Sequence, residues 1–186
     1  VAYARAGDGD LAGVDLAEVD FLLGDGWVLS VRERNEHGQL LDIGDVRQRL
    51  EQRRDLSISP GAIVYALLDA VVDGYFVAIE AAEDRLEAVE ERLFSADPPP
   101  DAELQQDLLD VRRRLILFRR RVVPMRDVVM AILRGEVAQI ENQTLLYYED
   151  VLDHLLRLLD QIDLQRELVG NVVDASLALS SNRMNQ

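Results

Sequence analysis

The chain has 186 residues, which suits one ordinary domain or one small domain with an extended appendage. Hydrophobic residues make up 48% and charged residues 30%, so the chain is expected to fold. Its 35 acidic residues outnumber 20 arginines and leave a net charge of −15. This argues against nucleic acid as a partner, because phosphate binding needs a basic surface. The absence of cysteine excludes disulfides, thiolate metal sites and a cysteine nucleophile.

Residues 1–58 are predicted to be part of a small α/β domain. Strand-like alternation is found at Val1 to Ala6, at Val14 to Leu23 and in the segment WVLSVRE from Trp27. The last two runs are joined by the short loop GDG, which predicts a hairpin within a small meander. The segment from Gly44 to Asp55 is predicted to be a short amphipathic helix.

The rest of the chain is predicted to be helical. Ser59 offers an N-cap with Pro60 in the first turn, and the helical pattern continues to about Ala96. The run DPPP must end this helix, because prolines cannot supply helical donors. A second helix is expected from Asp101 to about Arg134, with a kink at Pro124.

A third helix is expected from near Gln139 to the end of the sequence. The prediction is therefore an α+β fold in three parts. Residues 1–58 form a partial β-meander and α domain, residues 59–138 form a long antiparallel helical hairpin, and residues 139–186 form a stalk helix. No run of about 18 uncharged apolar residues is present to span a bilayer.

Two segments of opposite charge face each other in this predicted hairpin. The stretch EAAEDRLEAVEERL is acidic and the stretch RRRLILFRRR is basic. If the hairpin turns at the prolines, Glu83 and Asp84 fall roughly opposite Arg112 to Arg114. Pairing of charges within the hairpin is favoured over binding of the basic run to a membrane or to nucleic acid.

Two pairs of aspartates are candidates for a metal site. Asp69 and Asp73 are four residues apart, Asp150 and Asp153 are three apart, and each pair shares a helical face. Like charges at this spacing destabilise an isolated helix, so solvent, an arginine partner or a cation must favour them. Oxygen ligands suit Mg²⁺ or Ca²⁺. Spacing alone favours solvated or arginine-paired acids over a metal.

The last helix carries a narrow polar stripe. At 100° per residue, Ala178, Ser181 and Asn185 each lie within about 40° of the direction of Asp174. Apolar residues flank the stripe on both sides, as a helix lining the axis of a symmetric bundle requires. On periodicity alone, a surface helix that faces bulk water is the favoured interpretation.

Four segments in order resemble the CorA-type magnesium transporter family. YALLDAVVDGYF is similar to that family's Y-x-L-L-D-x-x-V-D-x-Y-F, and VPMRDVV to W-P-L-R-E-V-L. YYEDVLDHLLRLLD is similar to Y-F-R-D-V-Y-D-H-L-L-R-L-L-D. DASLALSSNRMNQ resembles D-x-Y-L-S-x-x-S-N-R-M-N-E, which in the family leads into the first transmembrane helix.

The resemblance implies a homopentamer in the plasma (inner) membrane, with this segment on the cytoplasmic side. Two transmembrane helices and a G-M-N selectivity loop are expected to follow, and more of the α/β domain to precede. In the family, cytosolic Mg²⁺ bound between subunits holds the channel closed. Mg²⁺ is thus both the regulatory and the transported ion, with Co²⁺ as a further substrate.

Site residues follow from the same resemblance. The residues expected to bind Mg²⁺ are Asp150, Asp69, Asp153 and Asp73, and those expected to line the pore are Asp174, Ser181 and Asn185. An acid from the upstream segment is expected to complete the principal site across the subunit interface. The sequence departs from the family's pattern at Ser176, Ala178 and Gly74.

Two alternatives remain open at this stage. The first is a transporter of zinc or another divalent cation from the same superfamily. The second is a soluble helical scaffold whose acidic hairpin binds a partner. No enzymatic activity and no organic cofactor are expected, because the sequence has no nucleotide-binding motif, zinc-protease motif or nucleophile elbow.

Overall fold

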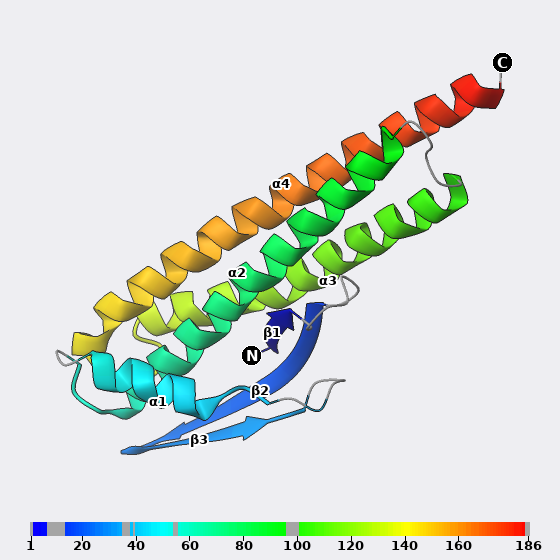
Figure 1. Cartoon of the computed structure of the whole chain (residues 1–186). Helices are drawn as coiled ribbons and strands as arrows, with labels where there is room; N and C mark the ends of the chain where they lie inside the picture. Colours follow the sequence, from blue (N-terminus) through cyan, green and yellow to red (C-terminus); the bar gives the residue numbers. More distant parts are fainter. Residues whose placement is uncertain are drawn as a thin grey trace.

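The computed structural model describes residues 2–6, 14–34, 38, 40–53, 56–95 and 101–184. A small antiparallel sheet and a short helix precede three long helices (Figure 1). This confirms the predicted α+β class. The elements are β1 (Ala2–Ala6), β2 (Val14–Gly24), β3 (Trp27–Arg32), α1 (Ile43–Gln52), α2 (Pro60–Leu93), α3 (Asp101–Leu133), the short 3₁₀ helix η1 (Asn142–Thr144) and α4 (Leu145–Met184).

The sheet has the strand order β1-β2-β3, and both pairings are antiparallel. The predicted hairpin is present, because Gly24 pairs with Trp27 across a two-residue turn. Gly26 in this turn has a φ of 77°, which glycine adopts without steric cost. Trp27 and Leu29 lie on one face of β3 and are about half exposed, at 53% and 52%.

Helix α1 is short and is held at its start by a side chain. The Asp42 carboxylate accepts a hydrogen bond from the backbone N–H of Gly44 at 2.7 Å, which satisfies one of the free donors of the first turn. Val46 is the buried residue of this helix. The helix ends at Gln52, shorter than the sequence predicted.

Helix α2 is the most buried of the long helices. Ser59 caps it by accepting a hydrogen bond from the backbone N–H of Ala62 at 3.2 Å, and Pro60 lies in the first turn as predicted. Among the described residues it is the one helix long and apolar enough to span a membrane, with a mean hydropathy of 1.9 in its most apolar window. Since 67% of that window is buried, α2 also fits the core helix of a bundle.

The three long helices pack as one bundle, in which α4 lies along both α2 and α3 (Figure 1). Tyr75 of α2 and Phe118 of α3 meet edge to face, with their ring centroids 5.2 Å apart. Leu155 and Leu158 of α4 are fully buried in the same core. The last helix is therefore a full member of the bundle along most of its length.

Close polar contacts join the start of α2 to the start of α4 and to the residues just before it. The Tyr148 hydroxyl donates a hydrogen bond to the Gly61 carbonyl at 2.7 Å, and the Ser59 hydroxyl donates to the Glu141 carboxylate at 2.8 Å. A Cβ at Gly61 would lie 2.7 Å from a Glu141 oxygen, so glycine permits this approach. These contacts fix α4 against the end of α2 that carries Asp69.

The start of the third helix was predicted too early. It begins at Leu145 rather than near Gln139, because two features stop helical geometry earlier. Gly135 has a φ of 75°, which ends the helical path after α3, and Glu141 is extended. Pro124 lies inside α3, which continues on both sides of it.

Ion pairs join the two helices of the hairpin, but the residues predicted to form them were wrong. The ion pairs between α2 and α3 join arginines of α2 to acids of α3: Arg85 to Asp107 at 2.8 Å, and Arg92 to Asp107 and Glu103 at 2.5 Å each. In the described part of the chain, no ion pair joins Glu83 or Asp84 to the arginines at 112–114. The arginines embedded in the acidic stretch of α2 point to α3 instead.

Candidate cation-binding site

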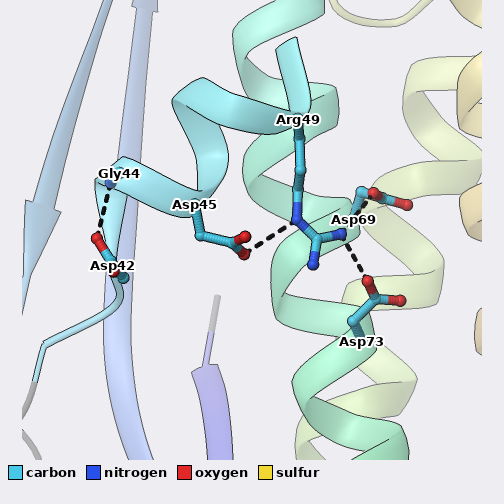
Figure 2. A network of polar contacts seen from close by, with 6 residues as sticks. All are labelled: Asp42, Gly44, Asp45, Arg49, Asp69 and Asp73. Carbon is cyan, nitrogen blue, oxygen red and sulfur yellow. Dashed lines mark hydrogen bonds and ion pairs between the residues drawn. The ribbon is translucent and has the colours of Figure 1, made fainter. Parts of the chain in front are cut away.

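The first pair of candidate aspartates lies where α1 crosses α2. Asp69 and Asp73 are one turn apart on α2, and Arg49 of α1 lies between them (Figure 2). One nitrogen of Arg49, Nη1, donates hydrogen bonds to Asp69 at 3.0 Å and to Asp73 at 2.5 Å. The sequence left solvent, an arginine or a cation as possible partners of this aspartate pair, and the structure shows an arginine.

Helix α1 orients Arg49 through its own acids. Arg49 Nε donates to Asp45, one turn earlier on α1, at 3.0 Å. This spacing is the favourable i,i+4 arrangement of an acid before a base. Arg49 is thus surrounded by three carboxylates, one from α1 and two from α2 (Figure 2).

Burial and charge change the acidity of these groups. Burial raises the pKa of Asp69, the nearby charge of Asp73 raises it further, and the hydrogen bond from Arg49 opposes both effects. For Arg49, burial acts to lower the pKa, but the hydrogen bonds to Asp73 and Asp45 outweigh it and raise the pKa. Arg49 therefore remains charged, and it supplies the positive charge that Asp69 needs.

Arg53, the residue that follows α1, contacts both α2 and α4. The guanidinium of Arg53 lies over the rings of Tyr65 and Tyr147, 5.8 Å and 5.6 Å from their centroids. It also donates a hydrogen bond to the Tyr65 hydroxyl at 3.0 Å. Burial, followed by the charge of Asp69, raises the pKa of Tyr65. Such cation–π contacts add about 0.5–1 kcal/mol each at exposed sites.

A polar pocket of about 290 Å³ lies beside these contacts. Its lining comes from the α1 residues that face α2, together with Tyr65 and Asp69. Asp69 is therefore accessible from this pocket, with 20% of its side chain exposed, while Asp73 is 48% exposed. Water and small ions can reach both carboxylates.

The second candidate pair lies on the outer face of α4. Asp150 and Asp153 are both exposed, and in the described residues neither forms an ion pair. Asp150 lies close enough to Tyr65 for its charge to raise the pKa of that hydroxyl. His154, which follows Asp153, packs edge to face with Phe76, with the ring centroids 6.0 Å apart.

The candidate acids do not form a complete metal site within one chain. The carboxylate oxygens of Asp69 and Asp73 are the ligands that Mg²⁺ prefers. Across the described residues, however, no group of three or more acids and histidines is arranged to hold a metal ion. The donor chemistry fits a divalent cation, but an arginine occupies the position between the two oxygens.

The predicted pore residues lie at the far end of α4. Asp174 and Ser181 are exposed, and Asn185 lies outside the described residues. The described part of the polar stripe, Asp174, Ala178 and Ser181, is therefore exposed in a single chain. This position is compatible with solvent and with the axis of an assembly alike.

Sequence reasoning missed Arg49 of α1 and Arg53, the residue that follows this helix. The two are four residues apart, and Asp45 precedes Arg49 by the same spacing. That regular acid–base–base series was a signal of a charged helix face. The partners of Arg49 on α2 lie 20 and 24 residues further along the chain and could not be predicted from this spacing.

Together, fold and site define an α+β protein in which a small sheet and a short helix precede three long helices, with an acidic cluster where the short helix α1 crosses α2. The family described as CorA-like Mg2+ transporter protein matches residues 4–186. The chain belongs to this family, as the sequence motifs indicated.

Individual relatives agree with this assignment. YfjQ of Bacillus subtilis is 33% identical over 173 residues, which are 92% of this chain and 52% of YfjQ. The cobalt/magnesium transport protein CorA of Thermotoga maritima is 29% identical over 181 residues, 96% of this chain and 50% of that protein. The chain thus spans about half the length of these relatives.

A solved structure shares the fold. The structure of full-length CmaX superposes with a TM-score of 0.80 at 23% identity, and covers 100% of this chain and 54% of CmaX. At this level of identity the likeness establishes the fold alone.

Proposed function

We propose that this chain is the cytoplasmic part of a membrane transporter for divalent cations, with Mg²⁺ and Co²⁺ as its substrates. The observation that carries the proposal is the family match over residues 4–186. The name of the Thermotoga maritima relative gives the ions. The protein would work as a homopentamer in the plasma (inner) membrane.

In this proposal, Mg²⁺ bound between neighbouring subunits keeps the transporter closed. The proposed ligands are Asp150 and Asp69, with Asp153 and Asp73 beside them. Asp150 and Asp153 are exposed on α4, where a neighbouring subunit can approach them. A pentamer would repeat the charge of −15 five times around one axis, and this self-repulsion is relieved by cations.

Helix α4 is the proposed link between these acids and the pore. Its 40 residues carry Asp150 near one end and Asp174 and Ser181 near the other. Because its inner face is packed on α2 and α3, a shift of the subunits would move the helix as a rigid unit. The proposed pore residues Asp174, Ser181 and Asn185 would contact a hydrated ion, since Mg²⁺ gives up its waters reluctantly.

The test compares two aspartates of α4 in the full-length protein. Asp150→Ala removes a proposed ligand, and Asp160→Ala removes another exposed charge at a different position of the same helix. We expect Asp150→Ala to weaken Mg²⁺-dependent protection from protease and the inhibition of flux by Mg²⁺, while Asp160→Ala keeps both. Unchanged protection and inhibition in Asp150→Ala would contradict the proposal. Flux measured with Mg²⁺, Co²⁺ and Zn²⁺ decides which ions are substrates.

A further inference from the structure

A single atom of Arg49 occupies the point between the two carboxylates of α2. Nη1 lies 3.0 Å from Asp69 Oδ2 and 2.5 Å from Asp73 Oδ2 (Figure 2). A bridging cation would contact the same two oxygens. The arginine therefore does here what a bound ion would do, by neutralising two like charges one turn apart.

A divalent cation and Arg49 cannot share this point. Mg²⁺ binds carboxylate oxygens at about 2.0–2.1 Å, so an ion between Asp69 and Asp73 would lie within the space of Nη1. The two cations would also repel each other at that distance. An ion can bridge both oxygens only after the guanidinium has left.

Departure of Arg49 would weaken the attachment of α1. This helix has ten residues, and its apolar contact with the core comes from the buried Val46 and the partly buried Leu50. Among the described residues, the side-chain hydrogen bonds that join this region to α2 come from Arg49 and from Arg53, the residue after the helix. Arg49 would not be left alone after release, because Asp45 on the same helix already accepts a hydrogen bond from its Nε.

We infer that Arg49 is a tethered competitor of the divalent cation at Asp69 and Asp73, so that binding of the ion detaches α1 from α2. The inference rests on the proposed function, because it concerns the same acids. Helix α1 is connected to the sheet: Arg32 of β3 donates a hydrogen bond to the Leu41 carbonyl, just before the helix, at 2.6 Å. Ion occupancy is thereby linked to the position of the sheet relative to the long helices.

The test uses Mg²⁺ alone as the probe and two arginine variants of the full-length protein. Arg49→Gln removes the competitor. Arg47→Gln removes the same charge from the same helix, but the Arg47 side chain is 80% exposed and pairs with Glu51 of its own helix. The first readout is the Mg²⁺ concentration that gives half-maximal protection from protease. The second is amide hydrogen exchange across residues 43–52.

We expect Arg49→Gln to reach half protection at about tenfold lower Mg²⁺, equivalent to about 1.4 kcal/mol, and Arg47→Gln to remain within about twofold of the unmodified protein. In the unmodified protein, Mg²⁺ should speed exchange in α1. Without Mg²⁺, Arg49→Gln should already exchange faster in α1, while α4 stays protected, which shows that the bundle is folded.

Three results would overturn the inference. Equal midpoints for Arg49→Gln and Arg47→Gln would show that the guanidinium does not compete with the ion. Unchanged or slower exchange of α1 on Mg²⁺ addition would show that the helix stays attached. If Mg²⁺ protects no protein, including the unmodified one, the proposed function fails and the inference fails with it.

Discussion

The contact between Tyr148 and Gly61 fixes the joint between α4 and α2, and its removal has a calculable effect. Tyr148→Phe deletes only the hydroxyl, which donates to the Gly61 carbonyl at 2.7 Å within the core. A hydrogen bond of this kind contributes about 0.5–1.5 kcal/mol net. The Gly61 carbonyl also faces the donors of its own helix, so it is not left unsatisfied. We therefore expect a loss of about 1 kcal/mol.

The assay is chemical denaturation of the chain followed by circular dichroism, with thermal melting as a second measure. A loss of about 1 kcal/mol should lower the melting temperature by about 2–4 °C in a chain of this size. Leu146→Ala is the control, because this residue lies on the same helical turn and is 67% exposed. It should change stability by less than about 0.5 kcal/mol. The reasoning is refuted if Tyr148→Phe is as neutral as the control.

Three further predictions concern the core and the charged groups. Leu155→Ala should lower the free energy of unfolding, measured by urea titration, by about 2–5 kcal/mol, because Leu155 is fully buried. Leu156→Ala should have a much smaller effect in that titration, because Leu156 is 43% exposed. Burial raises the pKa of Asp69 above its ordinary value of 3.8, so the folded state binds a proton at this carboxyl group more tightly than the unfolded state. The free energy of unfolding should therefore fall as the pH rises from the unfolded-state pKa to the folded-state pKa of Asp69. In Asp69→Asn, this part of the pH dependence should be absent. The hydrogen bond from Arg119 lowers the pKa of Asp163, so this ion pair should stabilise the fold at neutral pH and cease to do so as the pH falls through the acid range. Asp163→Asn should remove the ion pair and lower the free energy of unfolding by less than about 1 kcal/mol, and by still less in high salt.

Local signals in the sequence predicted the elements well. The helix cap at Ser59, the proline in the following position and the hairpin turn before Trp27 act within a few residues, and the structure contains all three features. The later start of α4 depends on Gly135 and on an extended Glu141. Neither glycine nor glutamate requires a non-helical backbone, so the helix predicted from the sequence began too early, near Gln139.

Partners that are distant in sequence could not be predicted in the same way. The aspartate pair at residues 69 and 73 was found from its spacing, and an arginine was one of its expected partners. That the partner is Arg49 depends on how α1 crosses α2. Likewise, Arg92 pairs with Asp107 because of the relative rotation of α2 and α3, which helical periodicity does not specify.

The central claim is tested most directly by measuring transport by the full-length protein. The Mg²⁺ concentration is varied on the side of the membrane where this part of the protein lies. The protein would be reconstituted in liposomes, and Mg²⁺ flux would be followed with a fluorescent indicator. The proposed function predicts flux that decreases as Mg²⁺ rises on that side. An absence of flux, or flux that does not respond to Mg²⁺ on that side, would contradict it.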